Sequence, residues 1–257
     1  MVFSSIPFLY YFLPAVLAVY FLTPRKGKNA VLLLASLIFY GGGELRLLPL
    51  MAFTILLCYV CGLGIERSRK RKKLWLLASI VISVGLLGVF KYADFFIGSL
   101  NAVTGLKIPL LHLALPVGIS FYTFQCLSYT IDVYRGSVPA QKNLINFGAY
   151  VALFPQLIAG PIVRYADIAR ELEHREHSWE NAAVGLRRFL VGLGKKVILA
   201  DNFALLIRLF RQSGEKSVLF YWMYAVAFAL NIYFDFSGYS DMAIGLGRVL
   251  GFHFVEN

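Results

Sequence analysis

An apolar stretch over residues 47–65 runs directly into Glu66-Arg67-Ser68-Arg69-Lys70-Arg71-Lys72-Lys73, where six of the last seven residues are basic. The stretch is long enough to cross a bilayer as a helix, which takes about 20 residues. Short loops rich in Lys and Arg stay on the cytoplasmic side of a membrane. The pattern therefore predicts a membrane-spanning helix whose carboxyl end faces the cytoplasm, and it constrains the whole chain to a membrane fold.

The composition agrees with a membrane protein. The chain is 59% hydrophobic and 15% charged, whereas soluble domains carry about 25% charged residues. The net charge of +11 comes from short basic clusters between apolar segments, which is typical of loops that face anionic lipid. We therefore expect the lipid bilayer, and no nucleic acid, as the partner of these charges.

The first apolar stretch covers residues 6–23, has no charge before it, and is followed by Pro24-Arg25-Lys26-Gly27-Lys28. A cleavable signal peptide has its positive charge first, so we expect an uncleaved helix with the amino terminus outside. In total we expect about six to eight membrane elements. The other expected spans cover residues 30–42, 74–90, 109–134 and 218–236. Three segments are expected at the surface: an interfacial helix or loop over 91–107, an amphipathic helix over 167–181 and an interfacial stretch over 189–209.

Residues 144–163 are apolar enough to cross but contain Phe154-Pro155-Gln156 and Ala159-Gly160-Pro161. Proline removes a backbone donor and disrupts a helix. A complete crossing would also leave the arginine-rich stretch 164–188 outside, against the positive-inside rule. We expect a broken or re-entrant element, covered by protein or by a cavity. The expected fold is an all-α polytopic transmembrane helical bundle with broken and interfacial helices, as one domain over residues 1–257.

The run from Phe234 to Met242 places Asp235 and Asp241 among Ser237, Tyr239 and other polar side chains at the end of an apolar stretch. Ionisable groups at membrane depth are costly and mark pathways, substrates or internal pairing. On a helix, Ser237 and Gly238 would share a face with Asp241. The run indicates either a functional site or hydrogen bonding between helices and pairing to arginine.

Histidine and cysteine offer little chemistry. Of the four histidines, His174, His177 and His253 lie outside the expected spans, and His112 is interpreted as part of the outer interfacial stretch. His174 and His177 could share a helical face, but no third ligand accompanies them, so we expect neither a metal site nor a histidine base. Cys58 and Cys61 sit inside an apolar stretch and are interpreted as helix-packing residues. Composition alone does not separate a transporter from an enzyme.

Four motifs resemble signatures of the bacterial membrane-bound O-acyltransferases: residues 115–125 (LPVGISFYTFQ), 129–136 (YTIDVYRG), 154–164 (FPQLIAGPIVR) and 233–245. Residues 1–5 and 192–201 match as well, so the resemblance covers essentially the whole chain. Within this family, the sequence is similar to the branch that contains the alginate O-acetyltransferase membrane subunit. The teichoic acid D-alanyl transfer protein is a more distant relative.

This resemblance implies acyl transfer from a cytoplasmic-side donor, with acetyl-CoA the candidate, to hydroxyls of an exported polysaccharide such as alginate. It implies a multi-pass protein of the bacterial inner membrane, without a bound cofactor or metal, and with a periplasmic acyl-transfer partner protein. Residues of the broken element would lie beside the tunnel, and residues of the acidic run would line or brace the cavity. The site residues carried over in this way are Gln156, Gly160, Pro161, Arg164, Asp235, Ser237, Tyr239 and Asp241.

The family's catalytic histidine, a general base for the acceptor hydroxyl, follows the Phe-Ser-Gly-Tyr-Ser-Asp segment at some distance, and members run to nearly twice this length. We therefore expect that histidine beyond Asn257 and assign His253 no catalytic role. The chain is interpreted as an amino-terminal portion that does not catalyse acyl transfer alone. Two alternatives are a non-catalytic remnant or scaffold and, from the broken helices and intramembrane Asp, a transporter.

Overall fold

A computed structural model describes residues 3–68, 70–157, 160–161, 163–214 and 217–256. The described residues form helices and contain no strand, which confirms the all-α prediction. The α-helices are α1 (Leu13–Leu22), α2 (Lys28–Glu44), α3 (Leu48–Arg67), α4 (Lys72–Thr104), α5 (Ile119–Arg135), α6 (Leu144–Ala152), α7 (Tyr165–Glu173), α8 (Trp179–Gly194), α9 (Asp201–Gln212) and α10 (Val218–Val249). Short helical segments join them: the π-helices η1 (Pro7–Phe12) and η4 (Lys195–Ala200), and the 3₁₀ turns η2 (Arg25–Gly27) and η3 (Leu45–Leu47).

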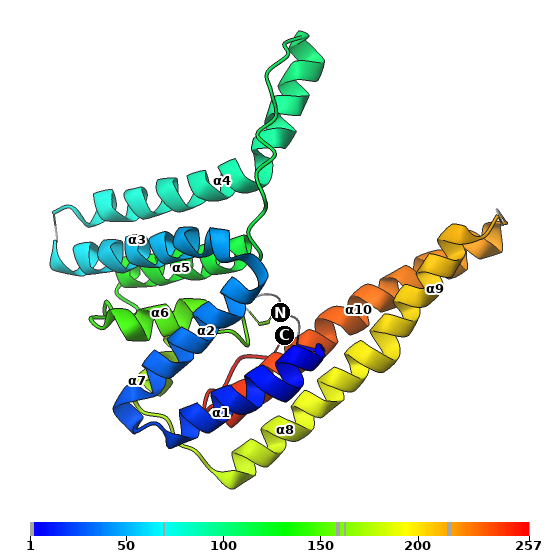
Figure 1. Ribbon diagram of the computed structural model, residues 1–257. Helices are drawn as coiled ribbons and strands as arrows, with labels where there is room; N and C mark the ends of the chain where they lie inside the picture. Colours follow the sequence, from blue (N-terminus) through cyan, green and yellow to red (C-terminus); the bar gives the residue numbers. More distant parts are fainter. Residues whose placement is uncertain (1–2, 69, 158–159, 162, 215–216, 257) are drawn as a thin grey trace.

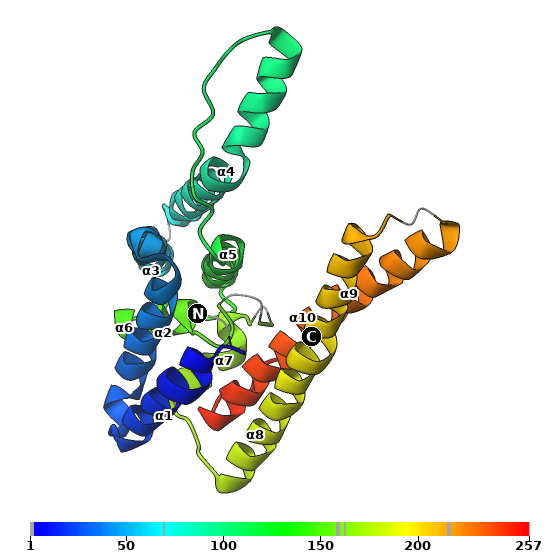
Figure 2. The ribbon, with the colours of Figure 1, turned by 45° about the vertical axis from the view of Figure 1, so that its right-hand side comes forward.

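The helices pack in two groups (Figure 1). In the first group, α3 packs against both α4 and α5, and α2 packs against α6. In the second group, α8, η4 and α9 run in succession along α10. The view in Figure 2 shows the same separation, with α1 between α2 and the α8–α10 pair.

Among the described residues, three helices are long and apolar enough to cross a membrane: Leu45–Arg67, Lys72–Thr104 and Val218–Val249. The helix Pro7–Leu22 is apolar but shorter. The span expected over residues 47–65 thus coincides with α3, and the basic run joins α3 to α4. Cys58 and Cys61 are buried and free on α3, and Cys58 Sγ lies 3.8 Å from Ser79 Oγ. This confirms the packing interpretation of the two cysteines.

The span expected over 74–90 and the element expected over 91–107 are not separate, because one continuous helix covers most of both; the interfacial position of residues 91–107 stays a prediction. Helix α4 continues to Thr104, bends along its length (Figures 1 and 2) and ends at Gly105, whose φ is +73°. Asp94, which suggested an interface, accepts the backbone N–H groups of Leu111 (2.7 Å) and His112 (3.0 Å). It therefore fastens the chain after α4 back onto that helix. The span expected over 109–134 also starts too early, because α5 begins only at Ile119.

The broken element is confirmed as a short helix followed by buried non-helical backbone. Helix α6 ends at Ala152, and the carbonyl of Leu153 accepts the N–H groups of Gln156 and Leu157, both at 3.1 Å. Phe154 has no exposed surface, and its N–H donates to Ser36 Oγ at 3.0 Å. Protein therefore covers this irregular backbone and supplies its hydrogen-bond partners, as a membrane interior requires. Residues 158, 159 and 162 of the predicted motif lie outside the described residues.

The single amphipathic helix expected over residues 167–181 is wrong. Two helices, α7 and α8, stand there, separated by residues 174–178. Ser178 starts the second helix, because its side chain accepts the N–H of Asn181 at 3.0 Å. His174 and His177 consequently lie in the loop between the helices and do not share a helical face.

The end of the last span at Phe236 is also wrong, whereas the interfacial placement of residues 189–209 stays a prediction. Residues 189–209 belong to α8, η4 and α9, which pack along α10, and α10 itself continues to Val249. The polar run that was expected to close the span is therefore inside a helix. Its carboxylates are tolerated there because basic side chains from the neighbouring helical segment pair with them.

Candidate functional site: an ion-pair cluster between α8 and α10

Asp241 is the centre of a charged cluster on α10. Its Oδ2 lies 2.6 Å from Lys195 Nζ, and its Oδ1 lies 3.0 Å from Arg188 Nε. Lys195 Nζ also donates to Ser237 Oγ at 3.0 Å. Two further nitrogens of Arg188 bind both carboxylate oxygens of Glu256. The cluster thus joins α8, η4, α10 and the segment that follows α10.

Helix geometry explains these meetings. Ser237 and Asp241 are one turn apart on α10 and share a face, as the sequence predicts. Arg188 and Lys195 are seven residues apart, close to two helical turns, so both reach the same side of α10.

The π-helix η4 adds a second ion pair. Lys196 follows Lys195 directly, and its Nζ lies 2.8 Å from Asp235 Oδ1 and 3.1 Å from Asp201 Oδ1. Both aspartates of the acidic run therefore have a lysine partner. The partners Arg188, Lys195 and Lys196 were missed as site residues; the available signal was the density of basic residues within an otherwise apolar stretch.

The electrostatics favour a fixed, charged arrangement. Glu256 and Asp241 raise the pKa of Arg188 above its ordinary value, and Arg188 lowers the pKa of Glu256. Asp241 is thus suited to hold Lys195 and Arg188 in place and to present charge to the pocket.

The cluster borders a pocket of about 320 Å³. Arg188, Ser237 and Asp241 form part of its polar wall. The remaining lining residues are Ser240, Glu256, Ile232, Tyr233 and Phe236. A pocket with hydroxyl, carboxylate and guanidinium groups beside aromatic rings can bind a polar group that carries an apolar portion.

The other predicted site residues lie in and after the broken element. Gln156 is buried, and its Nε2 donates to Tyr150 O at 2.8 Å. Its Oε1 has no hydrogen-bond partner among the described residues. Gly160 packs so tightly on this turn that an added Cβ would lie 2.6 Å from Gln156 Cα, and Pro161 is buried beside it. Arg164 is exposed at the start of α7, where its N–H donates to Asp167 Oδ2 at 3.0 Å.

Aromatic rings connect the two groups of predicted residues. The ring of Tyr239 stacks on Phe3 with 4.6 Å between centroids and 8° between planes, and Phe3 stacks on Phe8 at 4.7 Å. Phe8 and Phe12 contact Phe154 at 6.3 and 5.5 Å. An unbroken series of ring contacts therefore leads from α10 to the turn that holds Gln156.

The histidines lie apart from the Asp241 cluster. His253 Nδ1 is 2.7 Å from Glu171 Oε1, and His177 Nε2 is 2.9 Å from the Tyr20 hydroxyl. His112 lies in the segment that Asp94 holds. Within the described ranges, no three His, Cys, Asp or Glu side chains gather as metal ligands. The absence of a metal stays a prediction.

A helical membrane chain with a covered broken helix and ion pairs set between helices belongs to the class of polytopic membrane proteins that enclose a polar site. The particular family follows from comparison: the family model described as "MBOAT, membrane-bound O-acyltransferase family" matches residues 34–257. The chain belongs to this family.

Three curated relatives illustrate the range of similarity. The chain is 44% identical over 264 residues to a probable alginate O-acetylase of Azotobacter vinelandii, with 100% of this chain and 53% of the relative covered. It is 33% identical over 282 residues to the peptidoglycan O-acetyltransferase of Helicobacter pylori (96% and 54% covered). It is 26% identical over 147 residues to the teichoic acid D-alanyltransferase of Bacillus subtilis (55% and 37% covered). The chain spans about half the length of the first two.

Proposed function

We propose that this chain forms the membrane core of an O-acyltransferase that moves an acyl group to hydroxyls of an exported polysaccharide. Acetyl is the acyl group we favour. The relatives named for alginate and for peptidoglycan O-acetylation both support acetyl transfer to a polysaccharide. Alginate is the acceptor we favour because of the higher identity. The structural observation that carries the proposal is Asp241, held by two cations inside an apolar helix at the edge of a pocket.

The predicted residues then take different roles. Asp235, Ser237 and Asp241 brace the α8–α10 pair and give the pocket its charge. Tyr239 transmits the position of α10 to the broken element through Phe3. Gln156, whose Oε1 is buried without a partner in the described part of the chain, contacts the substrate path. Gly160 and Pro161 hold the turn that presents Gln156, and Arg164 fixes the start of the next helix.

The general base of this reaction is proposed to lie outside residues 1–257. A base must reach the acceptor hydroxyl within hydrogen-bonding distance, and His177 and His253 are already bound to Tyr20 and Glu171, apart from the Asp241 pocket. On this reading the 257-residue chain does not catalyse transfer alone. The acyl donor, for which acetyl-CoA is the candidate, approaches from the cytoplasmic side, and a periplasmic partner protein receives or delivers the acyl group.

The proposed setting is the bacterial inner membrane, with the amino terminus outside. The basic segments at residues 25–28 and 67–73 face the cytoplasm under the positive-inside rule. Fusion of a reporter that is fluorescent only in the cytoplasm, placed after Lys73, tests this orientation. Fluorescence is expected there, and its absence would overturn the assignment.

A cell-based assay tests the proposed function itself. The full-length gene is expressed in an alginate-producing strain that lacks its own O-acetylase, and the ester-linked acetyl of the exported polysaccharide is measured. Acetylation that is restored by the unchanged protein and lost in the Gln156→Leu variant supports the proposal. Normal export without any ester, from a well-expressed protein, would overturn it and favour a scaffold. Altered export of an unmodified polysaccharide would favour the transporter reading.

A further inference from the structure

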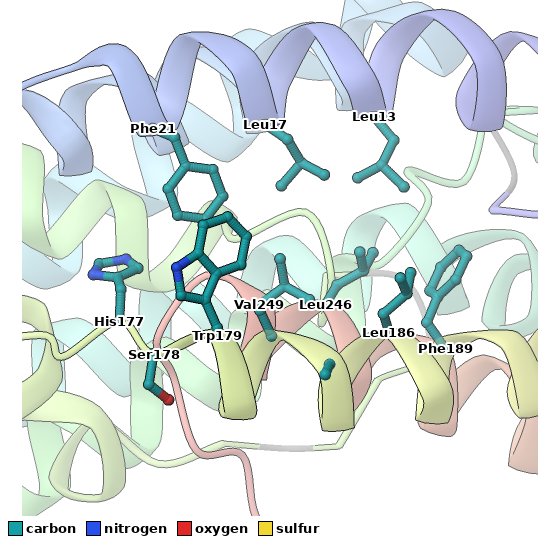
Figure 3. A pocket seen from close by; sticks show the side chains of 12 residues that line it. Leu13, Leu17, Phe21, His177, Ser178, Trp179, Leu186, Phe189, Leu246 and Val249 are labelled. Atoms are coloured by element: carbon teal, nitrogen blue, oxygen red, sulfur yellow. The ribbon is translucent and has the colours of Figure 1, made fainter.

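An apolar groove of about 780 Å³ runs between α1 and α8, outside the Asp241 site. Leu13 and Leu17 of α1 face Leu186 and Phe189 of α8 across it, as Figure 3 shows. The other lining residues are Phe21, His177, Ser178, Trp179, Ala182, Ala183, Leu246 and Val249. The size is within the range of ligand sites, about 300–1,000 Å³, and a helical-bundle groove of this kind can take an alkyl chain.

One end of the groove is marked by Trp179. Its side chain is 93% exposed, and in Figure 3 it lies at the same end of the groove as Phe21 and His177. Tryptophan is enriched where a membrane protein meets the boundary between lipid tails and headgroups. This end of the groove is therefore suited to lipid headgroups, and the leucine-lined remainder is suited to acyl chains.

Positive charge gathers at the same end. Lys28 Nζ lies 4.2 Å above the Tyr20 ring and donates to Tyr20 O at 3.1 Å. The Arg175 guanidinium lies 4.5 Å from the Phe252 ring and donates to Asn29 Oδ1. One buried nitrogen of Arg175, Nη1, has no hydrogen-bond partner in the described ranges.

These charges repel one another. Burial lowers the pKa of His177, and the positive charges of Lys28 and Arg175 lower it further. Lys28 behaves in the same way: burial lowers its pKa first, followed by Arg175 and Arg25. An acidic neighbour that acts on Arg175 is Glu171. The charged groups that act on His177 are Lys28, Arg175 and Arg25, all of them positive, so the positive charge beside His177 is undercompensated.

The hydrogen bonds around His177 determine which of its ring nitrogens carries the proton. The Tyr20 hydroxyl donates its proton to Leu250 O at 2.8 Å. His177 Nε2, 2.9 Å from the same hydroxyl oxygen, must then be the donor of that contact. A neutral imidazole in this state leaves Nδ1 without a proton, and protonation would add a donor to the groove end.

We propose that this groove binds an anionic phospholipid of the surrounding membrane. One acyl chain lies along Leu13, Leu17 and Leu186, and the phosphate lies at the end formed by Arg25, Lys28 and His177. The apolar lining of the groove matches an alkyl chain, and the exposed Trp179 marks its open end as suited to the level of lipid headgroups. The undercompensated positive charge selects an anionic headgroup over a zwitterionic one.

The test uses the fluorescence of Trp179 in the full-length protein, reconstituted in nanodiscs of phosphatidylcholine. Acyl-chain-brominated phosphatidylglycerol or brominated phosphatidylcholine is then titrated in, and the signal of a Trp179→Phe variant is subtracted. Stronger quenching by phosphatidylglycerol, saturating at a low mole fraction, is the expected result. Equal quenching by the two lipids, or none by either, would overturn the proposal.

Two variants with matched controls locate the lipid. Arg25→Gln removes one exposed cation at the groove end and is expected to lower the preference for phosphatidylglycerol about fivefold. Lys70→Gln removes one exposed cation elsewhere and is expected to leave the preference unchanged. Ala183→Phe fills the groove and should abolish saturable quenching, whereas Val184→Phe, one residue on and outside the lining, should not.

A full preference for phosphatidylglycerol in Arg25→Gln would contradict the headgroup placement. Unchanged saturable quenching in a folded Ala183→Phe protein would contradict the acyl-chain placement. The thermal unfolding midpoint of each variant shows whether it is folded, and Arg25→Gln keeps the proposal testable if Ala183→Phe does not fold.

Discussion

Gly192 on α8 and Gly238 on α10 meet backbone to backbone. A Cβ added to Gly192 would lie 2.5 Å from the carbonyl oxygen of Gly238, and one added to Gly238 would lie 2.8 Å from Gly192 O. Gly185 and Gly245 repeat this meeting one heptad away, at 2.5 Å in both directions. Small residues that let helix backbones approach are a general means of packing helices in membranes. Here the close approach brings Lys195 and Arg188 within reach of Asp241.

We expect Gly192→Ala to separate α8 from α10 and to lower the thermal unfolding midpoint in detergent by several degrees or prevent folding. Gly194→Ala is the matched control on the same helix, because an added Cβ there has no atom within 4 Å. The control should be as stable as the unchanged protein or slightly more so. Equal unfolding midpoints for the two variants would show that the glycine contacts do not hold the helices together.

Asp241 and Lys195 should be energetically coupled. Asp241→Asn and Lys195→Gln each leave a charged partner in a partly buried place, so each should destabilise the protein by about 2 kcal/mol. The double variant should recover part of this loss, with a coupling free energy of about 0.5–3 kcal/mol. A double-mutant cycle of unfolding midpoints measures it. Strictly additive losses of stability in the double variant would contradict the pairing of Asp241 with Lys195. Asp235→Asn should destabilise the protein less, because the Asp235 side chain is 47% exposed.

His177 gives stability a pH dependence of defined sign. Its pKa in the folded protein lies below the ordinary 6.5, because burial and the charges of Lys28 and Arg175 disfavour the imidazolium. Between the folded and unfolded pKa values the unfolded chain binds more protons, so this contribution is complete above about pH 6.5 and is lost as the pH falls below it. His177→Gln should reduce the decline of the unfolding midpoint between pH 7 and pH 5, measured against His174→Gln as control. An identical decline in both variants would assign it to other groups.

Gln156 and Gln125 form a matched pair for separating function from stability. Both side chains donate to the carbonyl of Tyr150, at 2.8 Å and 3.2 Å. Gln156→Leu should therefore leave the unfolding midpoint nearly unchanged, since Gln125 still satisfies that carbonyl, yet reduce acetyl transfer by the full-length protein at least tenfold. Gln125→Leu should leave most of the transfer intact. Equal losses of transfer in the two variants would remove the special role of Gln156.

The sequence predicted those features that depend on local physics. The span over 47–65 emerged as α3 because apolar length and a basic end are local signals. The break in residues 144–163 was predictable from Pro155 and Gly160, and α6 does end just before them. The shared face of Ser237 and Asp241 needed only helical spacing.

The errors arose where distant residues decide the outcome. The end of the last span was placed at Phe236 because the apolar stretch gives way there to the polar run with Asp235 and Asp241. Lys195 and Lys196, some forty residues earlier in the chain, neutralise them, and no local pattern reveals that contact. In the same way, no local pattern reveals that Asp94 accepts the backbone N–H groups of Leu111 and His112 and so ties the following segment to α4.

The π-helix η4 has a consequence for how the length of this helix could change. A π-turn holds one residue more than the α-helical repeat, and that extra residue lets the adjacent Lys195 and Lys196 both pair with carboxylates on α10. Deletion of that one residue would restore an ordinary α-helix and would leave α8 and α9 close to their present register with α10, including the contact of Asn231 Nδ2 with Ala200 O. What would be lost is the simultaneous pairing of two adjacent lysines with Asp235 and Asp241.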